Sequence, residues 1–134
     1  MSDRDTLLNL THCLLESIVQ GDWEAYCELC DPTLTCFEPE ARGCLVEGMD
    51  FHQFYFDLDR PPTSKPAKVQ TTLASPHVRM LGSDAAIVNY VRLTQSVDSA
   101  GVPHTRSAEE TRVWHKQGND WKLVHMHRSP LPQG

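Results

Sequence analysis

Three turn sequences divide the second half of the chain, and this feature restricts the possible folds most. From about residue 67 onward, four segments rich in β-branched and aromatic residues are separated by turn-forming residues. The turn sequences are Gly82-Ser83-Asp84, Ser99-Ala100-Gly101 and Gln117-Gly118-Asn119-Asp120. Because short turns join neighbouring strands of opposite direction, the sequence predicts a hairpin-linked antiparallel sheet in this half.

The first half of the chain shows helical periodicity instead. Ser2 can cap the first of its helices and Gly21 can close it. The expected elements are a helix over residues 7–19, a short helix from residue 22, a short strand over 34–37 and a third helix over 48–58. Helices followed by a hairpin-linked sheet are typical of an α+β fold, in which the helices cover one face of an antiparallel sheet.

The two faces of the predicted sheet are both partly apolar. Since side chains alternate along a strand, one long strand presents Val88, Tyr90 and Arg92 on one face and Ile87, Val91 and Leu93 on the other. The last strand presents Val124, Met126 and Arg128 on one face and Leu123, His125 and His127 on the other. A half-exposed sheet would alternate apolar and polar residues. We therefore expect the helices to cover one face and a second copy of the chain to cover the other.

Length and composition indicate one domain and exclude several functions. The 134 residues fit a single domain over 1–134, with a flexible loop over about 59–66, where three prolines fall, and a disordered tail over 130–134. A net charge of −6 argues against a nucleic-acid partner. No apolar stretch approaches the ~20 residues that span a bilayer, so we expect no membrane partner. The N-terminus lacks a signal peptide, and the five cysteines are typical of reduced thiols, which predicts a cytoplasmic protein.

Several longer runs of residues resemble one known family. They are Gly21-Asp22, Glu24-Ala25-Tyr26, Cys30-Asp31-Pro32, Phe37-Glu38-Pro39-Glu40-Ala41, Leu45-Val46-Glu47-Gly48-Met49-Asp50-Phe51-His52, Phe54-Tyr55-Phe56, Arg92-Leu93-Thr94-Gln95, Glu109-Glu110-Thr111-Arg112-Val113-Trp114-His115 and Val124-His125-Met126-His127-Arg128-Ser129. Together they resemble the association (hub) domain of calcium/calmodulin-dependent protein kinase II, over residues 7–129.

The resemblance implies a cone of the nuclear transport factor 2 type, with helices packed in a strongly curved sheet. It also implies a large homo-oligomer of two stacked rings, a dodecamer, a tetradecamer or a near relative. Hub domains of related kinases are further candidate partners. The sequence contains neither the glycine-rich loop with catalytic Asp and Asn of a kinase nor a basic amphipathic calmodulin-binding helix. We therefore predict that the chain is not an enzyme.

The resemblance also implies a pocket lined by arginines at the open end of the cone. The matching residues are Arg92, Arg112 and Arg128, with His52 nearby, and strand alternation adds Tyr90 and Glu110 to the candidate binding residues. Converging guanidiniums need anions. Glu38, Glu40, Glu109 or Glu110 can supply them internally, and a small carboxylate ligand can do so equally well. The sequence leaves both possibilities open.

Two other chemistries fit the sequence less well. His125 and His127 form an H-x-H on one strand face, near His115, and this spacing can bind zinc. No acidic or cysteine partner is evident on that face, so we interpret these histidines as interface residues. Small isomerases and dehydratases share the cone fold, and His52, Tyr90 and Glu110 could serve as an acid–base group there, which leaves an enzyme of this type as the alternative. We predict no catalytic residue, no metal site and no cofactor.

Overall fold

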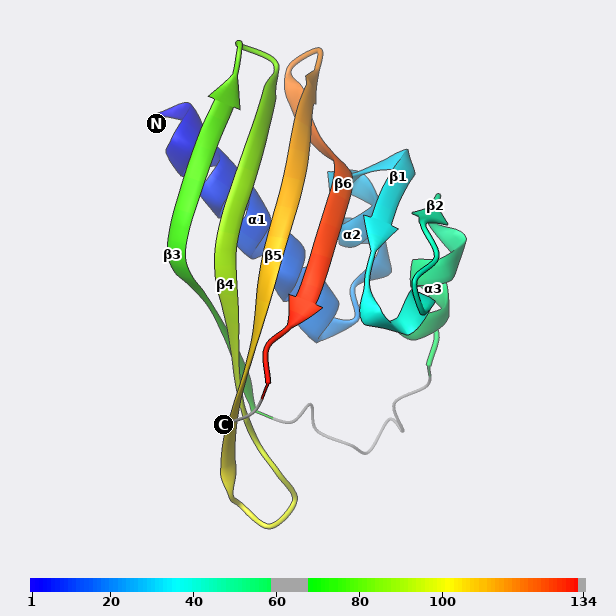
Figure 1. Cartoon of the computed structure of the whole chain (residues 1–134), viewed down its shortest axis with the longest axis vertical. Coiled ribbons are helices and arrows are strands. Elements are labelled where there is room, and N and C mark those ends of the chain that lie inside the picture. Colours follow the sequence, from blue (N-terminus) through cyan, green and yellow to red (C-terminus); the bar gives the residue numbers. More distant parts are fainter. Residues whose placement is uncertain (59–67, 133–134) are drawn as a thin grey trace.

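A computed structural model gives the architecture and describes residues 1–58 and 68–132. The elements in chain order are α1 (Asp3–Gln20), α2 (Trp23–Leu29), β1 (Cys30–Phe37), the 3-10 helix η1 (Pro39–Ala41), β2 (Val46–Glu47), α3 (Asp50–Phe56), β3 (Val69–Leu81), β4 (Ala85–Val97), β5 (Pro103–Gln117) and β6 (Asp120–Pro130). The helices form one layer and the strands another (Figure 1). None of the helices in the described part of the chain is long and apolar enough to cross a membrane.

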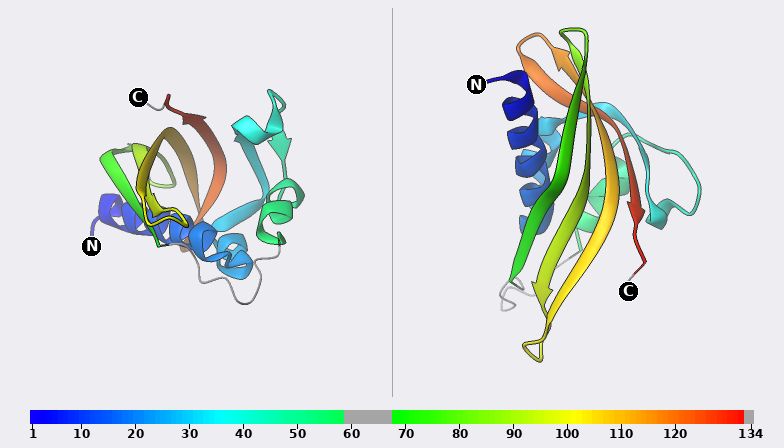
Figure 2. Two further views of the ribbon diagram at one scale, coloured as in Figure 1. Left: turned by 90° about the horizontal axis from the view of Figure 1, so that it is seen from below. Right: turned by 60° about the vertical axis from the view of Figure 1, so that its left-hand side comes forward.

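The strands form one six-stranded sheet in the order β2-β1-β6-β5-β4-β3. Strands β3 to β6 are a meander of antiparallel neighbours, as the three turn sequences predict. The pairing of β1 with β6 is parallel, because the chain crosses the whole sheet between these two strands. Figure 2 shows that the sheet curls around the side on which the helices lie.

Local signals at the helix ends behave as the sequence predicts. The Ser2 hydroxyl accepts a hydrogen bond from the Asp5 N–H at 3.1 Å and so caps α1. Gly21 closes this helix with φ 68°, a conformation that glycine adopts without strain, and its N–H donates to the Ile18 carbonyl. The Asp22 side chain then caps α2 by accepting from the Ala25 N–H.

The core lies between α1 and the inner face of the sheet. Leu7, Leu14 and Leu15 of α1 are fully buried, and Val88 of β4 and Trp114 of β5 are fully buried on the sheet side. Figure 1 shows α1 crossing behind the strands β3 to β5, whose near face carries no other element. The expectation that the helices cover one face of the sheet is confirmed. The other face, called the outer sheet face below, is covered by none of the described helices and strands.

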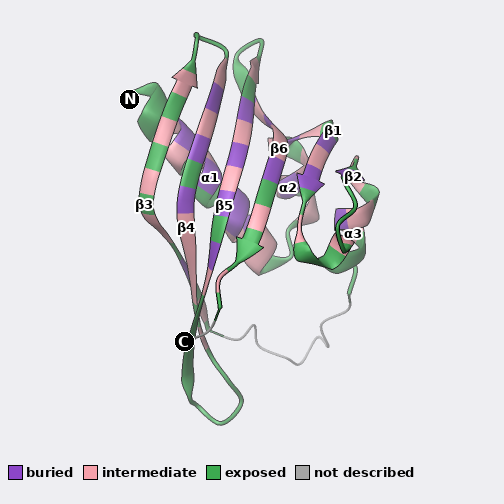
Figure 3. Ribbon diagram, in the orientation of Figure 1, coloured by how far each residue is buried: buried purple, intermediate pink, exposed green. Residues whose placement is uncertain are grey.

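A β-bulge in β6 corrects the predicted alternation in that strand. Trp114 of β5 pairs with Leu123, whereas the preceding Val113 pairs with His125, so Val124 is an extra residue in β6. Leu123 is therefore fully buried on the core face, together with Met126. The prediction that Leu123 shares the outer face with His125 and His127 is therefore wrong. The alternation predicted for β4 is confirmed, and burial alternates along this strand in Figure 3.

Two further predictions concern the loop and the tail. The loop expected over residues 59–66 lies outside the described residues, as do residues 133–134 of the expected tail. Pro130 is the last residue of β6, and the Leu131 N–H donates to the Ser107 carbonyl at 2.9 Å.

Candidate functional site

A cavity of about 270 Å³ lies between the inner face of the sheet and the three helices. Its charged and polar wall consists of Glu38, Glu40, His52, Arg92, Arg112 and Arg128. Its remaining wall consists of Ile18, Tyr26, Tyr55, Phe56 and Met126. We call this space the arginine cavity. It is the place where the structure brings together the three arginines and the histidine expected from the sequence.

Strand register explains why the three arginines converge. Arg128 of β6 pairs with Glu110 of β5, and Glu110 pairs with Tyr90 of β4, so these three side chains form one row across the inner face. Arg112 lies two residues from Glu110 along β5, and Arg92 lies two residues from Tyr90 along β4. Since a step of two keeps a side chain on the same face, all five point to the helix side of the sheet.

The innermost part of the site is a buried cluster of Arg112, Tyr90 and Glu110. Arg112 is fully buried, and its Nε donates to the Tyr90 hydroxyl at 2.8 Å while one Nη donates to Glu110 Oε1 at 3.0 Å. The Tyr90 hydroxyl also donates to Glu110 Oε1. Burial acts to raise the pKa of Glu110, but the charges of Arg112 and Arg92 hold it below its usual value. Glu110 therefore stays ionised and neutralises Arg112.

Arg92 lies at the edge of this cluster. Its Nη1 is 3.5 Å from Glu110 Oε2, so Glu110 is shared between two guanidiniums. Burial, which the Glu110 charge offsets in part, lowers the pKa of Arg92. The Nε of Arg92 and the Nη1 of Arg112 are buried and have no hydrogen-bond partner among the described residues. Two residues of the cavity wall thus each carry a guanidinium donor without an acceptor among the described residues.

The outer part of the site is an ion-pair network around Arg128. One Nη of Arg128 donates to both oxygens of Glu40 at 2.7 and 2.6 Å and lies 3.6 Å from Glu38 Oε2. Burial and the neighbouring Glu40 raise the pKa of Glu38. Glu38 Oε1 is 4.0 Å from His52 Nδ1. Burial and the charge of Arg112 lower the pKa of His52, so its ring is neutral at pH 7.

The charges around the cavity balance by count. Three guanidiniums meet three carboxylates, those of Glu38, Glu40 and Glu110. Both internal neutralisation and the binding of a further anion are therefore compatible with the site. What the arrangement offers a ligand is a set of directed N–H donors in a confined space rather than a large net positive charge.

Four of the six candidate residues from the sequence line the cavity, namely Arg92, Arg112, Arg128 and His52. Tyr90 and Glu110 lie behind Arg112 and orient it. Glu109, a candidate charge partner, is exposed because it neighbours Glu110 on the opposite face of β5.

The cavity residues Tyr26, Tyr55 and Phe56 were not predicted. Helical periodicity places them on apolar helix faces, which is the usual signature of a core and gives no sign of a cavity.

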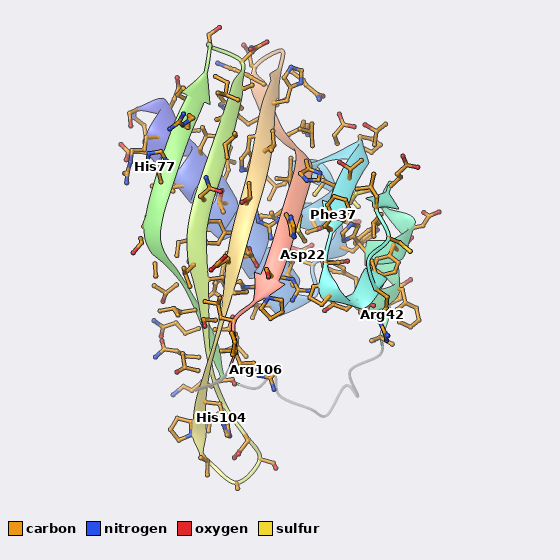
Figure 4. All side chains as sticks on the ribbon, in the orientation of Figure 1. Asp22, Phe37, Arg42, His77, His104 and Arg106 are labelled. Atoms are coloured by element: carbon orange, nitrogen blue, oxygen red, sulfur yellow. The ribbon has the colours of Figure 1, made fainter. Side chains whose placement is uncertain are left out.

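Among the described residues, the histidines of the outer sheet face belong to no group of three potential metal ligands whose atoms lie within 4.8 Å of one another. His125 Nδ1 lies 2.7 Å from the Thr35 hydroxyl, and the ring of His127 packs near Phe37. His115 Nε2 is 3.9 Å from Asp84 at the far end of β5. Figure 4 marks Phe37 on β1, the strand that pairs with β6. These side chains belong to the open face of the sheet.

Comparison with known proteins gives matches along nearly the whole chain. A family model described as the calcium/calmodulin dependent protein kinase II association domain matches residues 3–132. The delta subunit of calcium/calmodulin-dependent protein kinase type II from Oryctolagus cuniculus is 50% identical over 129 residues. This match covers 96% of the chain and 24% of the rabbit subunit, so the chain spans about a quarter of the length of that relative.

Solved structures agree with these matches. The calcium/calmodulin-dependent kinase II hub homology domain of Chlamydomonas reinhardtii has a TM-score of 0.92 and 50% identity, and covers 98% of this chain and all of that one. The association domain of the kinase from C. elegans has a TM-score of 0.84 and 47% identity over 93% of both chains. A nuclear transport factor 2-like protein from Salmonella enterica, 22% identical, has a TM-score of 0.72 over 98% of this chain and 93% of its own. The predicted α+β cone fold is confirmed.

Proposed function

The chain belongs to the calcium/calmodulin-dependent protein kinase II association-domain family, and on this premise we propose that it is a hub that assembles with copies of itself into a stacked ring. The proposed ring is a dodecamer, a tetradecamer or a near relative, and hub domains of related kinases are candidate partners in mixed rings. The proposed function is self-assembly into this ring, and catalysis is not part of it.

The open outer sheet face is the observation that carries this proposal. Ile87 of β4 and Val113 of β5 pair across the strands, and Val113 also pairs with His125 of β6. Phe37 at the end of β1 is 39% exposed. A sheet with apolar side chains on an uncovered face gains free energy when a second surface removes them from water. A copy of the same chain supplies such a surface in a symmetric assembly.

Light scattering coupled to gel filtration tests the assembly. We expect a species whose mass is a large multiple of 15.2 kDa at micromolar concentration, and native mass spectrometry counts its subunits. A 15 kDa species under these conditions contradicts the proposal, because it would be a monomer whose outer sheet face stays exposed to water.

We further propose that the arginine cavity binds a small carboxylate. The support is that Arg92 and Arg112 line a cavity of about 270 Å³ and that Arg92 Nε and Arg112 Nη1 have no acceptor among the described residues. A buried donor without an acceptor costs free energy, which a carboxylate oxygen relieves through a charge-assisted hydrogen bond. Arg128 lies on the same wall and can contribute when its ion pair with Glu40 opens.

Thermal melts with acetate, propionate or benzoate at matched ionic strength test this binding. A ligand at a hundredfold excess over Kd stabilises the folded protein by about 2.7 kcal/mol. We expect the melting temperature to rise with the carboxylate and to stay unchanged with propionamide, which has a similar size and no charge. Arg92→Ala should abolish the rise, and Arg4→Ala, which removes an exposed arginine of α1, is the matched control.

Two results would contradict the carboxylate proposal. If the wild type shows no rise while Arg92→Ala merely loses stability, the arginines serve as internal ion-pair partners of the three glutamates. If propionamide gives the same rise as propionate, the cavity selects shape rather than charge. Neither result affects the proposal of ring assembly, which depends on the other face of the sheet.

A further inference from the structure

Three side chains with different metal-ligating atoms meet at one end of the arginine cavity. They are Cys36 near the end of β1, Glu38 directly after it and His52 of α3. The thiol sulfur, a carboxylate oxygen and an imidazole nitrogen all lie within 4.8 Å of one another. Among residues 1–58 and 68–132, this is the one group of three such side chains this close together.

The backbone holds this group in place from two directions. Glu38 continues the extended conformation of β1, with φ −151° and ψ 156°, so its side chain points to the same side as that of Cys36. Phe37, between them, points to the outer sheet face. His52 lies in the first turn of α3, and its ring packs against the ring of Tyr26, with centroids 5.9 Å apart.

His52 lacks the hydrogen bonds that a buried imidazole normally makes. Its side chain is only 6% exposed, and its Nε2 has no partner among the described residues. Its Nδ1 is 4.0 Å from Glu38 Oε1, which is beyond hydrogen-bond distance. Burial of the Nε2 atom without a partner among the described residues costs free energy. A bound ion would give the ring a partner at Nδ1, the nitrogen that faces Glu38.

We propose that Cys36, Glu38 and His52 form a binding site for one zinc ion at the wall of the arginine cavity. Zinc accepts thiolate, imidazole and carboxylate ligands together, whereas softer ions prefer the thiolate and harder ions prefer oxygen ligands. Bond lengths of about 2.0–2.3 Å and a tetrahedral angle place neighbouring ligand atoms about 3.6 Å apart. Since the three atoms lie within 4.8 Å of one another, they need to approach by at most about 1.2 Å, which side-chain rotation can provide.

The surroundings of the site position one of the ligands and determine the charge balance. The two oxygens of Glu38 face different partners, since Oε1 lies nearer His52 and Oε2 lies 3.6 Å from Arg128. Arg128 can therefore orient the carboxylate while Oε1 binds the metal, as outer partners do in zinc sites. The Cys36 thiolate and the Glu38 carboxylate are the anionic ligands, and the proton of the Cys36 thiol passes to solvent on binding. Because Glu38 also offsets Arg128, the bound ion leaves the cavity with one positive charge in excess.

The three protein ligands leave the fourth coordination position of the zinc ion free. Glu38 and His52 both line the arginine cavity, so this fourth position opens toward it. Three protein ligands with one open position are typical of zinc ions that hold water or a small ligand. The zinc proposal stands without the carboxylate proposal, because the three protein atoms carry it alone.

Cobalt and zinc titrations of the metal-free, full-length chain in its assembled state test this site. The absorption spectrum of bound cobalt identifies a thiolate ligand, because a cobalt–thiolate bond gives a charge-transfer band in the near ultraviolet. We expect one cobalt ion per chain with this band, and its stoichiometric displacement by zinc. Cys36→Ser should remove the band, and His52→Gln should weaken zinc binding about 100-fold or more, since even outer partners contribute 10–100-fold to metal affinity.

Matched variants separate this site from surface binding. Cys13→Ser and Cys44→Ser remove the two exposed cysteines and should leave the band unchanged. His104→Gln removes the exposed histidine that pairs with Asp98 at 2.8 Å and should leave zinc affinity unchanged. A wild-type cobalt spectrum without the thiolate band overturns the proposal, whatever the stability of the variants. Zinc binding that survives Cys36→Ser and is lost in His104→Gln overturns it as well.

Discussion

Glu110 is the residue that makes the burial of Arg112 possible. The carboxylate accepts hydrogen bonds from Arg112 and Tyr90 and forms an ion pair with Arg92. Arg112 itself is fully buried at the centre of β5, where an uncompensated charge would be strongly unfavourable. The cluster is therefore held together by one anion that three neighbours share.

Replacing Glu110 by Gln should destabilise the fold severely. Gln keeps the size of the side chain and removes its charge, which leaves Arg112 and Arg92 without their counter-ion. Breaking a buried ion pair by neutralising one partner costs about 3–5 kcal/mol. Urea unfolding at a fixed protein concentration measures the loss. Glu109→Gln, one residue away on the exposed face of β5, is the matched control, and an equal loss in both variants would contradict this role of Glu110.

The arginines of the cavity were expected from the sequence, but their full surroundings were not. The family resemblance implied the pocket, and strand alternation independently supported it for Arg92 and Arg128. Glu38 follows the last strand residue and His52 sits in a short helix, and the distance between them depends on how α3 packs. No local pattern encodes that packing, and Cys36 therefore gave no sign of a metal site.

At the scale of elements, β6 shows how one residue changes the predicted faces. The alternation rule holds along β4, and it fails in β6 because Val124 is a bulge residue. Val124 has no glycine or proline neighbour that would signal the bulge. The parallel pairing of β1 with β6 was also not predicted, since short-range patterns describe hairpins and cannot place strands that are far apart in the sequence.

Asp31 connects two distant elements at the edge of the sheet. Its carboxylate accepts hydrogen bonds from the Thr33 N–H and hydroxyl within β1 and from Gln117 Nε2 at the end of β5. These hydrogen bonds, that of the Thr33 hydroxyl first, lower the pKa of Asp31 to about 2. The carboxylate thus ties the start of β1 to the last turn of the meander.

The lowered pKa of Asp31 predicts a defined pH dependence. Because the folded value lies below the unfolded value of about 3.9, the stabilisation is complete above the unfolded pKa and is lost as pH falls toward 2. Gln117→Ala should raise the pKa of Asp31 toward its usual value, as measured by carbon NMR of the side-chain carboxyl. Gln95→Ala, at an exposed site in β4, should leave it unchanged. An Asp31 that titrates near 3.9 in the wild type would contradict the proposed contacts.

At the scale of the whole molecule, the two faces of the sheet differ in how they are covered. The inner face packs against α1 and lines the arginine cavity. The outer sheet face carries Ile87, Val113 and His125 in one cross-strand row that nothing in the described chain covers. Changes in this row should therefore affect assembly and leave the fold of each subunit intact.

A charge at Val113 should disassemble the proposed ring. Val113 lies on the central strand β5, and Val113→Asp would place a carboxylate between Ile87 and His125 without disturbing the core. Removing that charge from water at a subunit contact is costly, so association weakens while each subunit keeps its circular dichroism spectrum. Light scattering should show smaller species than for the wild type, and Asn9→Asp on the exposed side of α1 should keep the wild-type mass. If Val113→Asp retains the full mass, the ring is held by other surfaces and the outer sheet face is not its contact.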